Sequence, residues 1–134
     1  MNIASAKIRR ATTAPLRKSV APGVLPGGVP VAESLLHQAI DQIISAFDPQ
    51  QIILFGSHAY GAPGPASDVD LLIVMDTEAR PAERIVGISR LLSPRPFPVD
   101  LIVRTPAELA RDLKRVDSFM REAVEQGWVL YARP

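Results

Sequence analysis

Two short runs decide how this chain folds: LFGSHAYG at residues 54–61 and SDVDL at residues 67–71. The first closes an apolar strand with a glycine–serine step, and the second opens the next strand with two aspartates. Because side chains alternate along a strand, Asp68 and Asp70 are expected to share one side of the sheet, with Cα atoms about 6.6 Å apart. Two such carboxylates repel each other, and their usual neutralising partner is a hard divalent cation. The window therefore predicts a metal site.

A third acid is expected to complete this site. Asp100 lies within the apolar run VDLIV at residues 99–103, where folding alone gives no reason for a charge. If this run forms a strand beside the aspartate strand, the two backbones lie about 4.8 Å apart and Asp100 can face the same pocket. Three carboxylates can hold two divalent ions about 4 Å apart, the arrangement used for in-line phosphoryl displacement. Mg²⁺ suits such a site, because a few carboxylates, waters and the substrate's phosphates satisfy it.

The glycine–serine step has a complementary task. Gly56 lets the backbone approach an anion closely, and a helix beginning just after it would aim free N–H groups and the Ser57 hydroxyl at a phosphate. The step is not a Walker loop, because no Gly-Lys-Ser/Thr follows it. An ordinary strand-ending turn is the alternative interpretation. Gly56 and Ser57 are therefore predicted to bind the phosphates of a nucleotide.

Length and charge set the outer limits. The 134 residues suffice for one domain, and the chain has no cysteine, which fits a cytoplasmic protein. Residues 1–30 carry five basic residues and no acid, so we expect a disordered Pro/Gly-rich tail, with a transit peptide as the alternative. The remaining 10 basic residues stand against all 14 acidic ones. This balance argues against a broad nucleic-acid-binding face, and no apolar run reaches the length of a membrane span.

Apolar periodicity predicts an α/β (α+β) sandwich with a small mixed sheet over residues 31–134. The expected order is a helix ending at Asp48, strands at 51–55 and 69–75, a helix at 81–92, a strand at 99–103, one or two helices to about 126, and a strand at 128–131. Thr105, Pro106 and Glu108 fit a capped helix start. The last helices carry an apolar stripe that is expected to be core or dimer surface, which leaves a homo-oligomer open: Leu109, Leu113, Val116, Met120 and Val124.

The glycine–serine step, ten intervening residues and the Asp-x-Asp together resemble the signature of the DNA polymerase β-like nucleotidyltransferase superfamily. Within it, the chain is similar to the minimal nucleotidyltransferases, small domains often encoded beside a HEPN-domain toxin. The resemblance covers about residues 31–131. It implies that Asp68 and Asp70 bind both metals, that Asp100 binds one and helps activate the acceptor hydroxyl, and that Gly56 and Ser57 grip the triphosphate.

The resemblance also implies an activity: transfer of AMP from ATP, with two Mg²⁺ ions, to a hydroxyl of a protein acceptor. The acceptor would be a HEPN-type toxin, and the chain an adenylylating antitoxin. One departure concerns His58 and Tyr60, which stand where many relatives carry arginines. It removes two possible phosphate-binding charges.

Other interpretations of the same residues remain open. Asp68 and Asp70 could belong to an Asx turn or a helix cap, and Asp100 could pair with Arg95 or Arg104. Arg104 could also reach a substrate phosphate or be a solvated strand end. The chain could also be a non-catalytic antitoxin that acts by contact, or a small-molecule nucleotidyltransferase of the aminoglycoside type. The last class usually carries an extra helical domain.

Overall fold

The computed structural model describes residues 33–56, 59, 68–95, 97–115 and 119–134. The expected tail at residues 1–30 lies outside this part of the chain. The described residues form helices and strands in the order α3 (Glu33–Phe47), β1 (Gln51–Phe55), β2 (Val69–Val74), α5 (Pro81–Leu91), β3 (Val99–Arg104), α6 (Pro106–Leu113), α7 (Phe119–Gln126) and β4 (Trp128–Ala132). This order confirms the predicted succession of elements.

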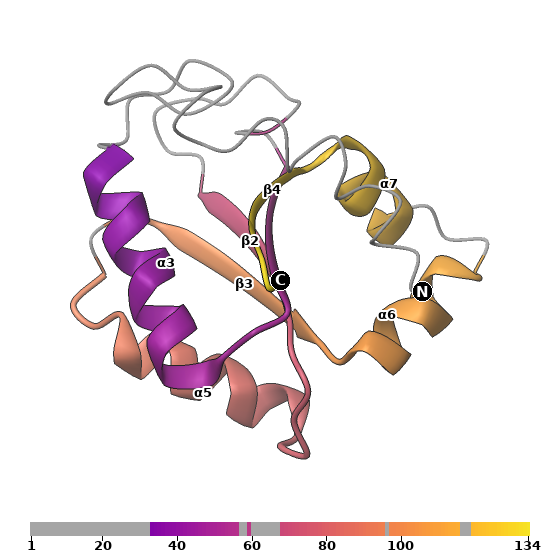
Figure 1. Ribbon diagram of the computed structural model, residues 1–134, viewed down its shortest axis with the longest axis horizontal. Helices are drawn as coiled ribbons and strands as arrows, with labels where there is room; N and C mark the ends of the chain where they lie inside the picture. The colour runs from indigo at the N-terminus through magenta and orange to yellow at the C-terminus, as the bar shows by residue number, and fades with distance from the viewer. Residues whose placement is uncertain (1–32, 57–58, 60–67, 96, 116–118) are drawn as a thin grey trace.

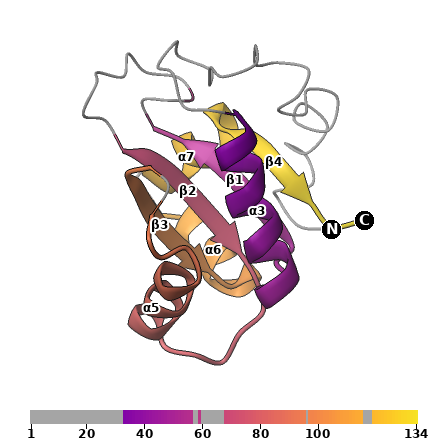
Figure 2. The same cartoon turned by 90° about the vertical axis from the view of Figure 1, so that its left-hand side faces the viewer.

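The four strands make one mixed sheet in the order β3-β2-β1-β4. β1 pairs antiparallel with β2 and β4, whereas β2 and β3 run parallel. Helices α3 and α5 cover one face of the sheet, and α6 and α7 cover the other (Figures 1 and 2). The predicted α/β sandwich is therefore confirmed, with β3 and β4 as its edge strands.

Strand alternation divides the core between the two faces. In β2, Leu71 and Ile73 pack with the residues under α3 and α5, whereas Leu72 and Val74 pack with those under α6 and α7. All four side chains are buried, which explains why β2 reads as a nearly continuous apolar run. The position after Val69 is the exception, and it carries Asp70.

The stripe predicted along the last helices belongs to this core. Leu109 and Leu113 of α6 and Met120 and Val124 of α7 are buried against the sheet, which favours the core interpretation over a dimer surface. The fifth member of the stripe, Val116, lies outside the described residues.

The start of α6 is capped as predicted. The Glu108 N–H donates to the Thr105 hydroxyl oxygen at 3.2 Å, and the Thr105 N–H donates back to the Glu108 carboxylate at 2.9 Å. Pro106 occupies the first turn of the helix, where its missing N–H needs no partner. The sequence alone thus located this helix start to the residue.

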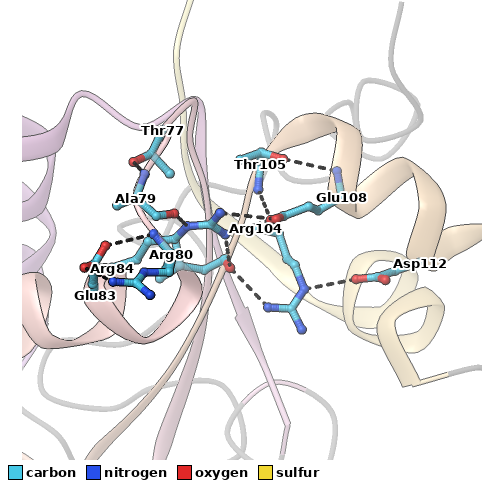
Figure 3. Close-up of polar contacts among 10 residues, drawn as sticks. Thr77, Ala79, Arg80, Glu83, Arg84, Arg104, Thr105, Glu108 and Asp112 are labelled. Atoms are coloured by element: carbon cyan, nitrogen blue, oxygen red, sulfur yellow. Dashed lines mark hydrogen bonds and ion pairs between the residues drawn. The ribbon is translucent and has the colours of Figure 1, made fainter.

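The apolar residues Ile85, Ile88, Leu91 and Leu92 recur at helical spacing and predict the core-facing stripe of α5, which is wrong at one position. Ile85 was expected to face the core, yet it is 39% exposed, and Arg84 is buried in its place. The Arg84 guanidinium donates to both carboxylate oxygens of Glu108, at 2.7 and 3.2 Å, and its Nε donates to the Ala79 carbonyl (Figure 3). A bidentate pair with a carboxylate satisfies the buried charge, so an arginine replaces the expected isoleucine.

This ion pair also joins the two sides of the sheet. Arg84 belongs to α5, Glu108 belongs to α6, and a third hydrogen bond from Arg84 reaches the Val103 carbonyl of the edge strand β3 (Figure 3). The pKa of Glu108 is lowered to about 2, first because it accepts the hydrogen bond from Arg84 and second because it accepts that from Thr105. The network therefore fastens β3 between the helix layers.

None of the helices among the described residues combines the length and the apolar composition that a bilayer crossing requires.

Candidate active site

Asp70 and Asp100 lie side by side on the two parallel strands. They are register partners in the β2–β3 ladder, near the N-terminal ends of both strands. Register partners on adjacent strands point to the same face of a sheet, and their backbones are about 4.8 Å apart. The faces of the neighbouring residues show that this is the side of α6 and α7. The structure thus brings together two of the three predicted acids.

Asp68 occupies a slightly different position from the one expected. β2 begins at Val69, so Asp68 directly precedes the strand, and its side chain is exposed. The Val69 N–H donates to the Pro98 carbonyl at 2.9 Å, which joins the start of β2 to the segment that leads into β3. This bond holds the Asp68–Asp70 segment against the start of the Asp100 strand.

The pKa of Asp70 reflects electrostatic repulsion among the three acids. The pKa of Asp70 is raised from 3.8 to about 6, chiefly by burial and then by the negative charges of Asp100 and Asp68. Burial and like charge both disfavour the ionised carboxylate. A cation bound between these groups would remove both penalties.

Gly56, at the end of β1, lies against the Asp70 carboxylate of this cluster. It follows β1, and its predecessor Phe55 is the register partner of Asp70. Its φ is +73°, and a Cβ placed on it would overlap the Asp70 carboxylate oxygen Oδ2. Only glycine fits this turn without strain. The missing Cβ therefore makes room for the Asp70 carboxylate itself, which lies directly against the Gly56 backbone.

The ion pairs considered for Asp100 do not form. Arg95 donates to the Val99 carbonyl at 3.1 Å, and Arg104 pairs with Asp112 at 3.0 Å. Within the described part of the chain, no hydrogen bond or salt bridge reaches the exposed Asp100 carboxylate. A structural role as an ion-pair partner therefore does not explain this acid.

The donor chemistry of the site suits a hard cation. Among the described residues, no three His, Asp or Glu side chains gather closely enough to hold a metal ion by themselves. Mg²⁺ does not need such a cage, because one or two carboxylates together with substrate phosphates and waters bind it. The pair Asp70 and Asp100 supplies those carboxylates, with Asp68 next to them.

Three predicted or discussed positions of the window lie outside the described residues: Ser57, His58 and Tyr60. The same holds for the helix expected to begin after Ser57. The phosphate-binding roles of Ser57 and Gly56 therefore stay predictions, and for Gly56 the structure adds the close contact with Asp70.

A pocket on the same face was not predicted. It has a volume of about 130 Å³ and is lined by Arg104, Asp112, Arg115, Phe119 and Met120. Its residues come from β3, α6, the segment after α6 and the start of α7, so only the folded chain assembles it. The one sequence signal was Arg104, four residues beyond Asp100, which was considered as a phosphate contact.

Comparison with known proteins agrees with this geometry. A family model described as a nucleotidyltransferase domain matches residues 36–125. A solved structure from Sulfolobus solfataricus, provisionally described as a nucleotidyltransferase, matches with a TM-score of 0.54 and 24% identity over 75% of this chain and 79% of that one. At this identity the match shows the fold alone. No curated protein matches the chain significantly. The family match spans most of the described fold and contains all three acids, and it shows that the chain belongs to the nucleotidyltransferase domain family of the polymerase β-like superfamily.

Proposed function

We propose that the chain transfers AMP from ATP to a hydroxyl of a protein acceptor, in a reaction that depends on Mg²⁺. The observation that carries this proposal is the in-register pairing of Asp70 and Asp100 on adjacent parallel strands beside the Gly56 turn. This pairing places two carboxylates on one face of the sheet, where a cation and the phosphates that it carries would bind. A cytoplasmic location, which supplies ATP and Mg²⁺, is part of the proposal.

The proposed reaction assigns a task to each acid. Asp68 and Asp70 would hold both metal ions, and Asp100 one of them. Mg²⁺ bound there would neutralise the phosphates and polarise the reacting oxygens. The acceptor oxygen attacks the α-phosphorus, pyrophosphate leaves, and Asp100 receives the hydroxyl proton. Asp100 suits this last role because its carboxylate is exposed and meets no cation among the described residues.

The position of the site supports a macromolecular acceptor. β3 is an edge strand, and both Asp68 and Asp100 are exposed, so a hydroxyl on another protein's surface can approach them. The resemblance to minimal nucleotidyltransferases makes a HEPN-type toxin the partner of choice, and the chain would then be an antitoxin that works by adenylylation.

The test uses the product of the neighbouring gene as acceptor. The partner is incubated with the chain, Mg²⁺ and ATP labelled at either the α- or the γ-phosphate. Label should appear on the partner from α-labelled ATP only, and the D68N/D70N double variant should transfer none. The contrary outcome has two parts: the partner stays unlabelled with each of the four α-labelled nucleoside triphosphates, and the D68N/D70N variant still neutralises the toxicity of the partner. Together they would establish an antitoxin that acts by contact.

Gly56 provides a separate prediction. We expect Gly56→Ala to lower the transfer rate at least about 10²-fold, because the new methyl group displaces the Asp70 carboxylate and a misplaced catalytic group costs about that much. The φ of +73° also strains any residue with a Cβ, so the variant should unfold at a lower temperature. The rate and the Tm are measured together, with Gly87→Ala in α5 as control. There the added methyl group meets only ordinary contacts with Phe47, and the rate should stay unchanged.

A further inference from the structure

The pocket of about 130 Å³ beside α7 lies on the same sheet face as the carboxylates. Along β3, Asp100, Ile102 and Arg104 alternate with buried residues of the opposite face, so these three line one track from the acids to the pocket. The pocket therefore lies on the same sheet face as the acids, further along β3.

A second path links the pocket to the acids. Phe55 is the register partner of Asp70, and directly opposed residues of antiparallel strands have Cα atoms about 5 Å apart. The Phe55 ring meets the Phe119 ring edge to face, with centroids 5.8 Å apart. Phe119 lines the pocket, so the Phe55–Phe119 contact connects the pocket to the strand position opposite Asp70.

The size and lining of the pocket favour a flat ring. Pockets for complete drug-sized ligands measure about 300–1,000 Å³, whereas an apolar cavity of about 150 Å³ accepts benzene. At about 130 Å³, this pocket fits one ring system whose remainder extends outside. Phe119 is 47% exposed although it is a large apolar side chain, and its neighbour Met120 adds a soft apolar wall. Nucleobases stack on aromatic side chains of this kind.

The polar groups of the pocket match one edge of adenine. The Arg104 Nε donates to Asp112 Oδ2, and its Nη1 donates to the Val103 carbonyl. Among the described residues, no hydrogen bond uses Arg104 Nη2 or Asp112 Oδ1, so the pocket offers both a donor and an acceptor. Adenine carries both kinds of partner, the acceptor N1 beside the N6 amino group, and the other bases also carry neighbouring donors and acceptors.

We propose that this pocket binds the adenine base of the nucleotide, with Phe119 stacking on the ring and the Arg104–Asp112 pair contacting its N1 and N6 edge. The inference rests on the proposed function for the position of the phosphates. Arg115, an exposed cation, lines the same pocket. Base binding would then reside in β3, α6 and α7.

Methionine NMR tests the occupancy of the pocket directly, because the chain has only three methionines. Met120 lines the pocket, whereas Met75 is buried in the core on the opposite face of the sheet. In protein labelled at the methionine methyl groups, α,β-methylene-ATP with Mg²⁺ should shift the Met120 signal and leave the Met75 signal in place. Met120→Leu assigns the signal. Nucleotide binding, seen by calorimetry, without a Met120 shift would overturn the inference.

Tripolyphosphate with Mg²⁺ separates a base from a phosphate. If it shifts Met120 as much as the nucleotide analogue does, the pocket binds phosphate and the inference is wrong. This result is distinct from a failure of the proposed function. Transfer activity with an unmoved Met120 signal rejects only the base pocket, whereas a Met120 shift without transfer to any acceptor keeps the base pocket and rejects the proposed reaction.

Substitution of the aromatic side chain gives an independent measure. Phe119→Ala should weaken binding of α,β-methylene-ATP about 5- to 100-fold and leave tripolyphosphate binding unchanged. Phe119→Trp should restore the nucleotide affinity, because stacking needs only a flat ring. Val86→Ala removes another exposed apolar side chain from α5, on the opposite face, and should change neither affinity. Equal nucleotide affinity of Phe119→Ala and the wild type would contradict the inference.

Discussion

Replacing Asp70 with asparagine should lower the rate of nucleotidyl transfer about 10³-fold or more. Metal-assisted charge stabilisation is worth several kcal/mol, and each 1.36 kcal/mol changes a rate tenfold. Asp100→Asn should produce a loss of similar size, since the two side chains are register partners at one site. The matched control is Asp76→Asn, an exposed aspartate just beyond the other end of β2, which should keep the wild-type rate. Rates of D70N and D100N within tenfold of wild type would contradict the assignment.

The same Asp70→Asn change should stabilise the metal-free protein at neutral and alkaline pH. The pKa of Asp70 is about 6 in the folded state and 3.8 in the reference state, so the folded protein binds the proton more tightly. Stability is therefore lost as the pH rises from about 4 to 6, and above this range the ionised Asp70 opposes folding. In EDTA, the Tm of D70N should exceed that of the wild type at pH 8, and the difference should vanish near pH 3.5. Asp76→Asn again serves as the control.

Glu108→Gln is expected to have the largest effect on stability, a loss of about 3 kcal/mol in the free energy of unfolding. The Arg84 side chain is only 5% exposed, so the substitution leaves a buried guanidinium without its counter-charge. Arg84→Met should cost less, about 1–2 kcal/mol, because it removes the buried charge and Glu108 is 25% exposed and retains Thr105 as a donor. Urea denaturation at pH 7 measures both, and an equal or smaller loss for E108Q would contradict this account of the pair.

The acid dependence follows from the lowered pKa of Glu108. Because this pKa is about 2 in the folded state and 4.5 in the reference state, the unfolded chain takes up the proton first. The stability that Glu108 contributes is complete above about pH 5 and is lost as the pH falls toward 2. The difference between the wild type and E108Q should therefore be largest above pH 5 and should shrink below it. Glu83→Gln in α5 is the matched control, since that glutamate caps a helix in the same way while its partner Arg80 is exposed.

The site was predictable from sequence where local rules decide. Two acids inside apolar strands are costly, and a period of two along each strand places Asp70 and Asp100 on defined faces. Strand alternation alone, however, does not decide whether β3 pairs beside β2. The register of the parallel ladder comes from packing of both helix layers, and only the structure shows that Asp70 and Asp100 are partners in it. The expectation of adjacency is confirmed, and the metal-binding roles stay predictions.

In α5 the buried side chain is Arg84 and not its neighbour Ile85, which shows where local rules fail. Hydropathy assigns an arginine to solvent, since an isolated buried charge is unfavourable. Glu108 reverses this preference, and it lies 24 residues further along the chain. No periodicity in the sequence connects the two. The pocket at Phe119 escaped prediction for the same reason, because its lining combines side chains from β3, α6 and α7.

Cation binding measured without any acceptor tests the central claim most directly. Calorimetry measures the binding of α,β-methylene-ATP saturated with Mn²⁺, a carboxylate-preferring substitute for Mg²⁺. The account predicts that the wild type and D76N bind the Mn²⁺–nucleotide complex alike and that D70N/D100N loses this binding by at least about tenfold, as expected when metal ligands are removed. Equal Mn²⁺–nucleotide binding by the wild type and D70N/D100N would contradict the claim that these two carboxylates form the metal site.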